Sequence, residues 1–160
     1  MIKLLSLVFA LLSGSVYAGE IEDQIAEFAK YEYPNDQKMQ SYVYKKQLRA
    51  YKYLESVQDL EVKQFASYAY PNDFVMQKYT YDKQVSAKIY MSAMTEQDVL
   101  NIAKRAYPND YAMQKYTFDK QISAKRYMSS LEDDSLKKAA LRQYPNDYAM
   151  QKYTYDRLAF

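Results

Sequence analysis

The chain contains no cysteine and no histidine in its 160 residues. Without cysteine it cannot form a disulfide bond or carry a lipoprotein-type anchor, so its stability has to come from packing alone. The lack of histidine removes the commonest metal ligand and the commonest general base. These absences weigh against a metal centre and against the usual acid–base chemistry.

Glycine and long hydrophobic runs are also scarce. The only two glycines, Gly14 and Gly19, lie close to the N-terminus. Glycine supplies most of the left-handed backbone conformations that β-hairpins need. The longest apolar run, Leu4 to Leu12, is shorter than the ~20 residues that span a membrane. The composition therefore favours helices over sheets and predicts no membrane span in the mature chain.

The N-terminus has the pattern of a cleavable signal peptide over residues 1–18. Lys3 precedes the short apolar run, and small residues with a Val16-Tyr17-Ala18 ending follow it. Cleavage after Ala18 leaves residues 19–160, with 21 basic and 20 acidic side chains once Lys3 is removed. We expect an exported protein, periplasmic or secreted, whose balanced charge disfavours binding to nucleic acid or anionic lipid.

A 37-residue repeat runs through the mature chain. The string Tyr-Pro-Asn-Asp begins at positions 33, 70, 107 and 144, which are 37 residues apart. Met, Gln and aromatic residues recur in register after it, so the chain holds four copies, at about 21–57, 58–94, 95–131 and 132–160. A period of this length is typical of stacked helical units. We expect residues 19–160 to form a single helical repeat domain.

Each copy reads as a short helix, a corner and a long helix. In the third copy the short helix shows apolar residues at helical spacing, namely Val99, Ile102, Ala103 and Ala106. Thr95 and Asp98 resemble a capping box at its start. Tyr-Pro-Asn-Asp then forms the corner, because proline holds the residue before it in an extended conformation and Asp suits a helix start. The proline is also compatible with the first position of the long helix.

The long helix of the third copy, about residues 110–129, carries two apolar faces. One comprises Tyr111, Phe118 and Ile122, and the wider one comprises Met113, Tyr116, Ala124, Tyr127 and Met128. A helix buried on two sides fits a right-handed α-solenoid of four 37-residue helix–turn–helix repeats after a signal peptide. The first and last copies depart from the pattern as capping repeats do, with Gln37-Lys38 at the first corner.

The architecture resembles the helical-hairpin solenoids, of which tetratricopeptide repeats are the familiar case. The signature residues of that family are missing, and its period is about 34 residues. The string at 107–116 also resembles a short aromatic-Pro-Asp-Asp-Tyr-x-Met-Gln-x-Tyr motif of exported bacterial proteins of unassigned function. That resemblance implies a bacterial envelope setting and no activity.

No set of residues in the sequence indicates a reaction. We find no nucleophile beside a base, no metal-ligand cluster and no glycine-rich phosphate loop, and we expect no catalytic residues, cofactor or metal. The acid pair Asp133-Asp134 fits the start of the fourth short helix better than acid–base catalysis. The corner Asn-Asp pairs supply too few oxygens for calcium and fit turns and caps.

Tyrosine and glutamine are the remaining candidates for a binding surface. Most of the 20 tyrosines should be core, with Tyr111 and Tyr148 the best candidates for exposure and partner binding. Glutamines recur seven residues apart on the long helices, and they either bond between neighbouring copies or face a ligand. The glutamine candidates for partner binding are Gln77, Gln84, Gln114 and Gln121.

These observations predict a non-enzymatic protein-interaction or scaffold module outside the cytoplasm, because solenoids offer extended surfaces. The expected partner is a protein of the cell envelope or of the outside medium. The alternative is a protein that binds glycan or cell wall through exposed tyrosine and amide side chains.

Overall fold

A computed structural model describes residues 19–159 of the chain. All regular secondary structure in these residues is α-helical, and no strand occurs among them, as the composition predicts. The expected signal peptide lies outside the described residues. Within residues 19–159, no helix has both the length and the apolar character to cross a membrane.

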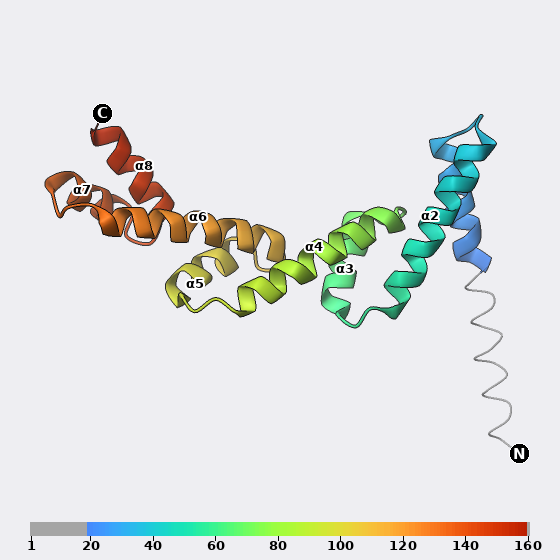
Figure 1. The fold of residues 1–160 in the computed structure, drawn as a ribbon, viewed down its shortest axis with the longest axis horizontal. Coiled ribbons are helices and arrows are strands. Elements are labelled where there is room, and N and C mark those ends of the chain that lie inside the picture. The colour runs from blue at the N-terminus through green and yellow to red at the C-terminus, as the bar shows by residue number, and fades with distance from the viewer. Residues whose placement is uncertain (1–18, 160) are drawn as a thin grey trace, which may run out of the picture. The chain divides into compact units, whose positions relative to one another are not determined.

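Short and long helices alternate along the chain (Figure 1). Residues 19–32 are helical and precede the long helix α2 (Gln37–Ser56). The helices that follow are α3 (Leu60–Ala69), α4 (Phe74–Ser92), α5 (Gln97–Ala106), α6 (Tyr111–Ser130), α7 (Ser135–Gln143) and α8 (Tyr148–Ala159).

At each corner, the short helix ends at the tyrosine and the long helix begins after the aspartate. In the third copy, Tyr107 is the C-cap with φ −139° and donates its N–H to the Ala103 carbonyl at 3.1 Å. This extended φ is the one that a following proline requires. Asp110 is the N-cap, and its Oδ1 accepts from the Met113 N–H at 2.9 Å. The proline lies in the turn, so it does not open the long helix.

The same cap occurs at all four corners. The N-cap bonds of the other three are 3.0 Å long and join Asp36 to Met39, Asp73 to Met76 and Asp147 to Met150. No described residue has a positive φ, and the corners therefore turn without glycine.

The short helices begin in two different ways. Asp134 caps α7 by accepting the Lys137 N–H at 2.7 Å, which confirms that the acid pair marks a helix start. Helix α5 begins after Glu96, which makes no side-chain cap bond. The predicted capping box at Thr95 and Asp98 is therefore wrong, and Asp98 bonds to side chains instead.

The chain divides into two compact units, and the boundary lies between Asp82 and Lys83, inside α4. The core of the first unit is built from Ile25, Leu54, Val62, Ala66 and Phe74 together with smaller buried side chains. In the second unit, α6 packs against α5 and α8, and α7 packs against α8. The buried cluster of the second unit consists of Met91, Val99, Leu100, Ala103 and Phe118.

The predicted apolar faces are correct in their centres and wrong at their edges. Val99 and Ala103 are fully buried, whereas Ile102 is half-buried and Ala106 is exposed. On α6, the predicted core residues Phe118, Ala124 and Met128 are buried, and Met113 is only half-buried. The largest error is Tyr116, whose side chain is 62% exposed. Helical spacing groups residues by face, but the breadth of the covering neighbour decides how much of that face is buried.

Candidate functional site

One set of glutamines joins each long helix to the next corner. The amide of Gln84 donates to Asp110 Oδ1 at 2.7 Å, and its Oε1 accepts from the Ala112 N–H at 3.1 Å. The side chain thus bonds to the N-cap residue and to an N–H in the first turn of the following helix. Such an N–H has no partner within its own helix. Equivalent pairs of bonds join Gln47 to Asp73 and Val75, and Gln121 to Asp147 and Ala149.

A second set of glutamines bonds to the corner of its own copy. Gln114 Nε2 donates to the Tyr107 carbonyl at 2.7 Å, which pairs a carbonyl at the end of the short helix. The same bond links Gln40 to Tyr33, Gln77 to Tyr70 and Gln151 to Tyr144. In the described part of the chain, the buried Oε1 atoms of Gln114 and Gln151 have no hydrogen-bond partner.

The four glutamines proposed as partner-binding candidates therefore lie in the interior. Gln77, Gln84, Gln114 and Gln121 are 2–5% exposed. Their amides bond to corners and, for Gln77, also to Ser67 Oγ at 3.3 Å. The sequence left two interpretations of these glutamines, bonds between copies or contact with a ligand. Gln84 and Gln121 bond between copies, and the partner of each is the next corner. We do not include the four in the candidate surface below.

A tyrosine, an aspartate and a lysine form a second recurrent contact between long helices. Tyr90 Oη donates to Asp119 Oδ1 at 2.8 Å, and Lys115 pairs with the same carboxylate while its Nζ lies 4.3 Å from the centre of the Tyr90 ring. Equivalent triads are Tyr53 with Asp82 and Lys78, and Tyr127 with Asp156 and Lys152.

These bonds change the acidity of their members. The hydrogen bond to Asp82 raises the pKa of Tyr53 to about 12, and the equivalent bonds raise the pKa values of Tyr90 and Tyr127. The bond from Lys152 lowers the pKa of Asp156. The hydrogen bonds favour the protonated form of the three tyrosines, so the triads act as structural links between helices.

The two tyrosines expected to be the most exposed are half-buried. Tyr148 Oη donates to Asp98 Oδ2 at 2.6 Å, and Lys125 binds the same oxygen at 2.6 Å. These two bonds lower the pKa of Asp98 to about 2. Tyr111 carries Lys88 Nζ at 4.9 Å from its ring centre. Both tyrosines belong to contacts between helices, which reduces what they can offer to a partner.

A different set of tyrosines, one on each long helix, is exposed. The side chains that lie two positions after the second set of glutamines are 57–62% exposed, and they are Tyr42, Tyr79, Tyr116 and Tyr153. Their exposure follows from helix geometry once the structure has placed the glutamines in the interior. Two positions along a helix correspond to a rotation of about 200°, so a residue two positions after a buried glutamine faces away from the interior.

Each exposed tyrosine lies between a methionine and a cation on the same face of its helix. A methionine precedes it by three positions and is half-buried, and an exposed basic residue follows it by four. We call these groups the Met–Tyr–cation triplets. They are Met39, Tyr42 and Lys46; Met76, Tyr79 and Lys83; Met113, Tyr116 and Lys120; and Met150, Tyr153 and Arg157.

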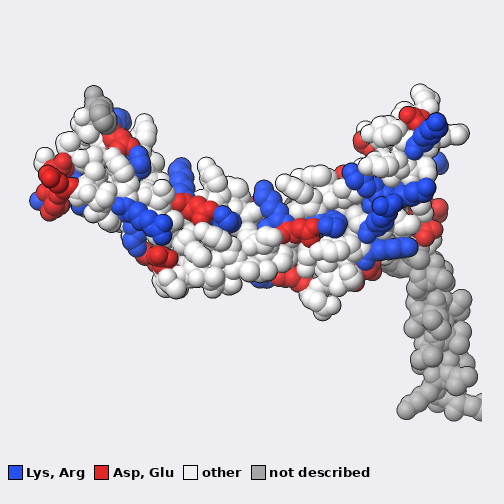
Figure 2. All heavy atoms as spheres, viewed as in Figure 1, with Lys and Arg blue, Asp and Glu red and all other residues white. Residues whose placement is uncertain are grey.

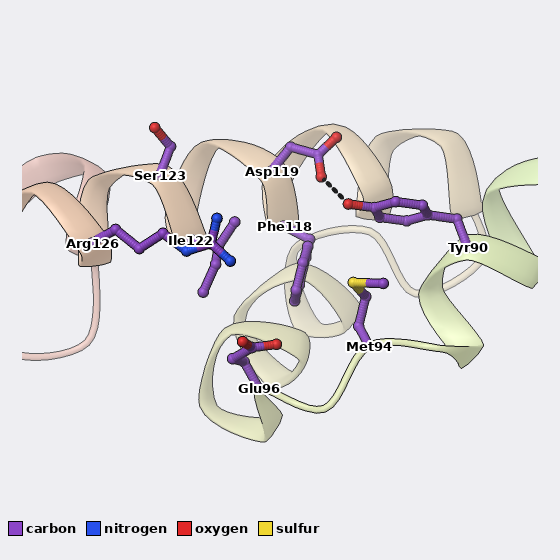
Figure 3. Close-up of a pocket in the computed structure, with 8 residues that line it drawn as sticks. All are labelled: Tyr90, Met94, Glu96, Phe118, Asp119, Ile122, Ser123 and Arg126. Atoms are coloured by element: carbon purple, nitrogen blue, oxygen red, sulfur yellow. Dashed lines mark hydrogen bonds between the residues drawn. The ribbon is translucent and has the colours of Figure 1, made fainter.

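The second unit also contains a cavity of about 330 Å³ beside the Tyr90–Asp119 bond (Figure 3). Met94, Phe118 and Ile122 supply its apolar lining. In Figure 3 the Tyr90 hydroxyl points at Asp119, which ties that polar group to the structure. The remaining lining residues are Glu96, Ser123 and Arg126.

Two grooves lie at equivalent places in the two units. One, of about 530 Å³, is formed by α5 residues such as Asn101 and Arg105 together with Asn146 of the next corner. The other, of about 400 Å³, is formed by Glu27, Tyr31 and Asn72, with further residues of the helix at 19–32. Corresponding residues are 74 positions apart, which is two repeats. Glu27 and Tyr31 of the smaller groove correspond to Asn101 and Arg105 of the larger one, which also contains Asp98 and Tyr148.

Among residues 19–159, no cluster of three or more carboxylates is placed to hold a metal ion. No protein family, curated protein or solved structure matches the chain. The fold class, all-α, is established by the structure itself.

Proposed function

We propose that the chain is an exported, non-enzymatic protein-interaction or scaffold module. In this proposal the four copies form a right-handed α-solenoid, a single domain over residues 19–160, after cleavage of a signal peptide at residues 1–18. The partner is a protein of the cell envelope or of the outside medium.

The observation that carries the proposal is the presence of a Met–Tyr–cation triplet on each long helix. The glutamines and corner aspartates bond within the chain, whereas the four tyrosines remain 57–62% exposed. Tyrosine and methionine are enriched in protein interfaces, where a rigid ring with a polar tip contributes strongly to binding. A surface repeated on successive long helices suits a partner that is itself extended or repetitive.

Photo-crosslinking in intact cells tests this proposal. A photoreactive phenylalanine analogue at Tyr116 should give a discrete crosslinked species, because that ring is exposed on the candidate surface. The matched control places the analogue at Lys104, which is exposed on the short helix of the same copy. A crosslinked species of the same size and yield from both positions would show that the triplets are not the binding surface.

Export needs its own measurement. We expect N-terminal sequencing of the protein from the envelope or the medium to begin at Gly19. Recovery of soluble protein that retains Met1 would contradict the proposed localisation, without bearing on the interaction surface.

The second candidate, a glycan- or cell-wall-binding protein, is favoured by the same exposed rings and by the groove amides of Gln24 and Asn72, which bond to each other at 2.9 Å. Tyrosine rings stack on sugar faces because they combine an apolar body with a polar tip. Binding of a neutral glycan that is weakened by Tyr79→Ala and Tyr116→Ala, together with a lack of crosslinked protein, would favour this candidate.

A further inference from the structure

The long helix of the first copy, α2, carries the largest excess of basic over acidic side chains among the long helices that the structure describes. Its 20 residues include five basic side chains and one acid, Glu55. All five basic side chains are exposed, and none forms an ion pair with another described residue. They are Lys38, Lys45, Lys46, Arg49 and Lys52.

Four of these side chains lie along one face of α2. Lys38, Lys45, Arg49 and Lys52 are separated by seven, four and three residues, the spacing of a single helical face. Tyr42 belongs to the same face, four positions after Lys38, and its ring is 57% exposed. We call these five residues the α2 stripe. It extends about 20 Å along the helix axis, and Figure 2 shows the basic side chains gathered over α2.

The other copies show that the stripe is specific to the first. Lys45 stands where the later copies have Asp82, Asp119 and Asp156, the carboxylates of the tyrosine–lysine contacts. Lys38 stands where the later copies have Val75, Ala112 and Ala149, whose N–H groups bond to a glutamine of the preceding helix. Two positions that serve contacts between copies elsewhere therefore carry lysine in α2.

A general need for solubility does not explain this pattern. A polar end surface normally mixes charges of both signs, whereas the stripe carries cations alone. The acids of residues 19–32 lie on a separate helix, and burial, followed by the charges of Glu22 and Asp23, raises the pKa of Tyr44. Tyr44 is two positions from Tyr42 and so faces away from the stripe. The positive charge of the stripe is therefore left available to an anionic ligand.

We propose that the α2 stripe binds an acidic polysaccharide, a linear chain of sugars that carry carboxylates. Lysine is depleted from the cores of protein interfaces, so a lysine-rich stripe fits a flexible polyanion better than a folded protein. Lysine is also a point charge that suits dispersed anions, and the Tyr42 ring offers a stacking surface among the cations. The proposal goes beyond the function proposed above and does not depend on a protein partner.

Titration calorimetry with polygalacturonate at low and raised salt tests the proposal on the full mature chain. The variant Lys38→Val/Lys45→Asp/Arg49→Ser installs the residues found at positions 75, 82 and 86 of the second copy, which a long helix already accommodates. We expect it to bind about tenfold more weakly or worse, with a flatter salt dependence. Circular dichroism confirms that the variant keeps its helicity and melting temperature.

The control Lys104→Glu/Arg142→Glu also lowers the net charge by four, at exposed positions of α5 and α7 outside both the stripe and the triplets, and it should bind like the parent. The reverse test installs Ser86→Arg and Ile89→Lys in the second copy, at the positions of Arg49 and Lys52, and should strengthen binding. Equal weakening by the stripe variant and the control would overturn the proposal. Tighter binding of polyglutamate or anionic vesicles would overturn it too, as would salt-sensitive self-association that the stripe variant abolishes.

Discussion

At the scale of single residues, the corner aspartates and the glutamines form hydrogen bonds that the local sequence does not predict. Asp110 caps α6, which a turn motif predicts, and it also accepts a bond from Gln84, 26 residues earlier in the chain. A cap shared in this way links helix formation to contact between copies. Asp36 has the cap bond to Met39. Among the described residues, however, no glutamine stands 26 positions before Asp36, as Gln84 does before Asp110.

The first prediction compares these two aspartates. Replacing Asp110 by alanine should lower the free energy of unfolding by about 2 kcal/mol, because it removes a cap and leaves the buried Gln84 amide without its acceptor. Asp36→Ala should cost about 1 kcal/mol, the usual value of a cap. Urea denaturation of both variants measures the difference, and equal costs would show that the glutamine bond contributes little.

The second prediction concerns two methionines of α6. Met128 is 3% exposed, and Met128→Ala should cost about 2–5 kcal/mol through lost burial and a cavity. Met113 is half-buried beside the exposed Tyr116, so Met113→Ala should cost about 1 kcal/mol, since solvent already covers part of the side chain. Urea denaturation measures both costs. A larger loss of unfolding free energy for Met113→Ala than for Met128→Ala would show that Met113 belongs to the core.

At the scale of helices, successive long helices are joined by the tyrosine–aspartate–lysine contacts. Edge-to-face rings accompany each contact, with centroids 6.3 Å apart for Tyr53 and Tyr81, and 6.4 Å apart for Tyr90 and Phe118. In each contact the tyrosine hydroxyl has a raised pKa. The stabilisation that this contact provides should therefore fall at alkaline pH.

The third prediction follows from the direction of that shift. The pKa of Tyr53 rises from 10.0 to about 12 on folding, so its bond to Asp82 stabilises the protein fully below pH 10. This contribution is lost as the pH rises from 10 towards 12, because the unfolded tyrosine ionises first. Thermal melts at a series of pH values should show a steeper alkaline loss for the parent than for Tyr53→Phe. Parallel curves for the two proteins would contradict the link.

At the scale of the whole molecule, the side-chain bonds between copies are local in sequence. The bonds from the first set of glutamines and from the tyrosines of the triads join residues 26–29 positions apart, from one copy to the next, and the bond from Tyr148 to Asp98 spans 50 positions. Stability in such a chain is a sum over copies and the contacts between neighbours. No disulfide adds to it, since the sequence has no cysteine.

The fourth prediction is that a single copy does not fold alone. A peptide of residues 95–131 leaves Gln121 without its corner and Met128 without the helices that cover it, so it should be largely unfolded. The mature chain should be predominantly helical. Circular dichroism of the two compares them directly, and a cooperative melt of the isolated peptide would show that contacts between copies are dispensable.

The sequence was sufficient to predict the helical class, the four corners, the aspartate caps and the centres of the apolar faces. Those features depend on interactions within a few residues, such as the bond from Asp110 to the Met113 N–H. The sequence was insufficient for Tyr116 and for the binding candidates. Helical spacing placed Tyr116 with Met113 and Ala124, and only the position of a neighbouring helix decides which of them is covered.

The repeat, the helix type and the corner chemistry are therefore determined by the amino-acid sequence itself, since each follows from local backbone preferences and side-chain bonds over short distances. The tertiary structure decided that the glutamines are interior links, that Tyr111 and Tyr148 lie in helix contacts, and that Tyr42, Tyr79, Tyr116 and Tyr153 are exposed. The physical reason is that burial depends on contacts with residues more than 20 positions away, and a helical pattern does not specify which face those residues will cover.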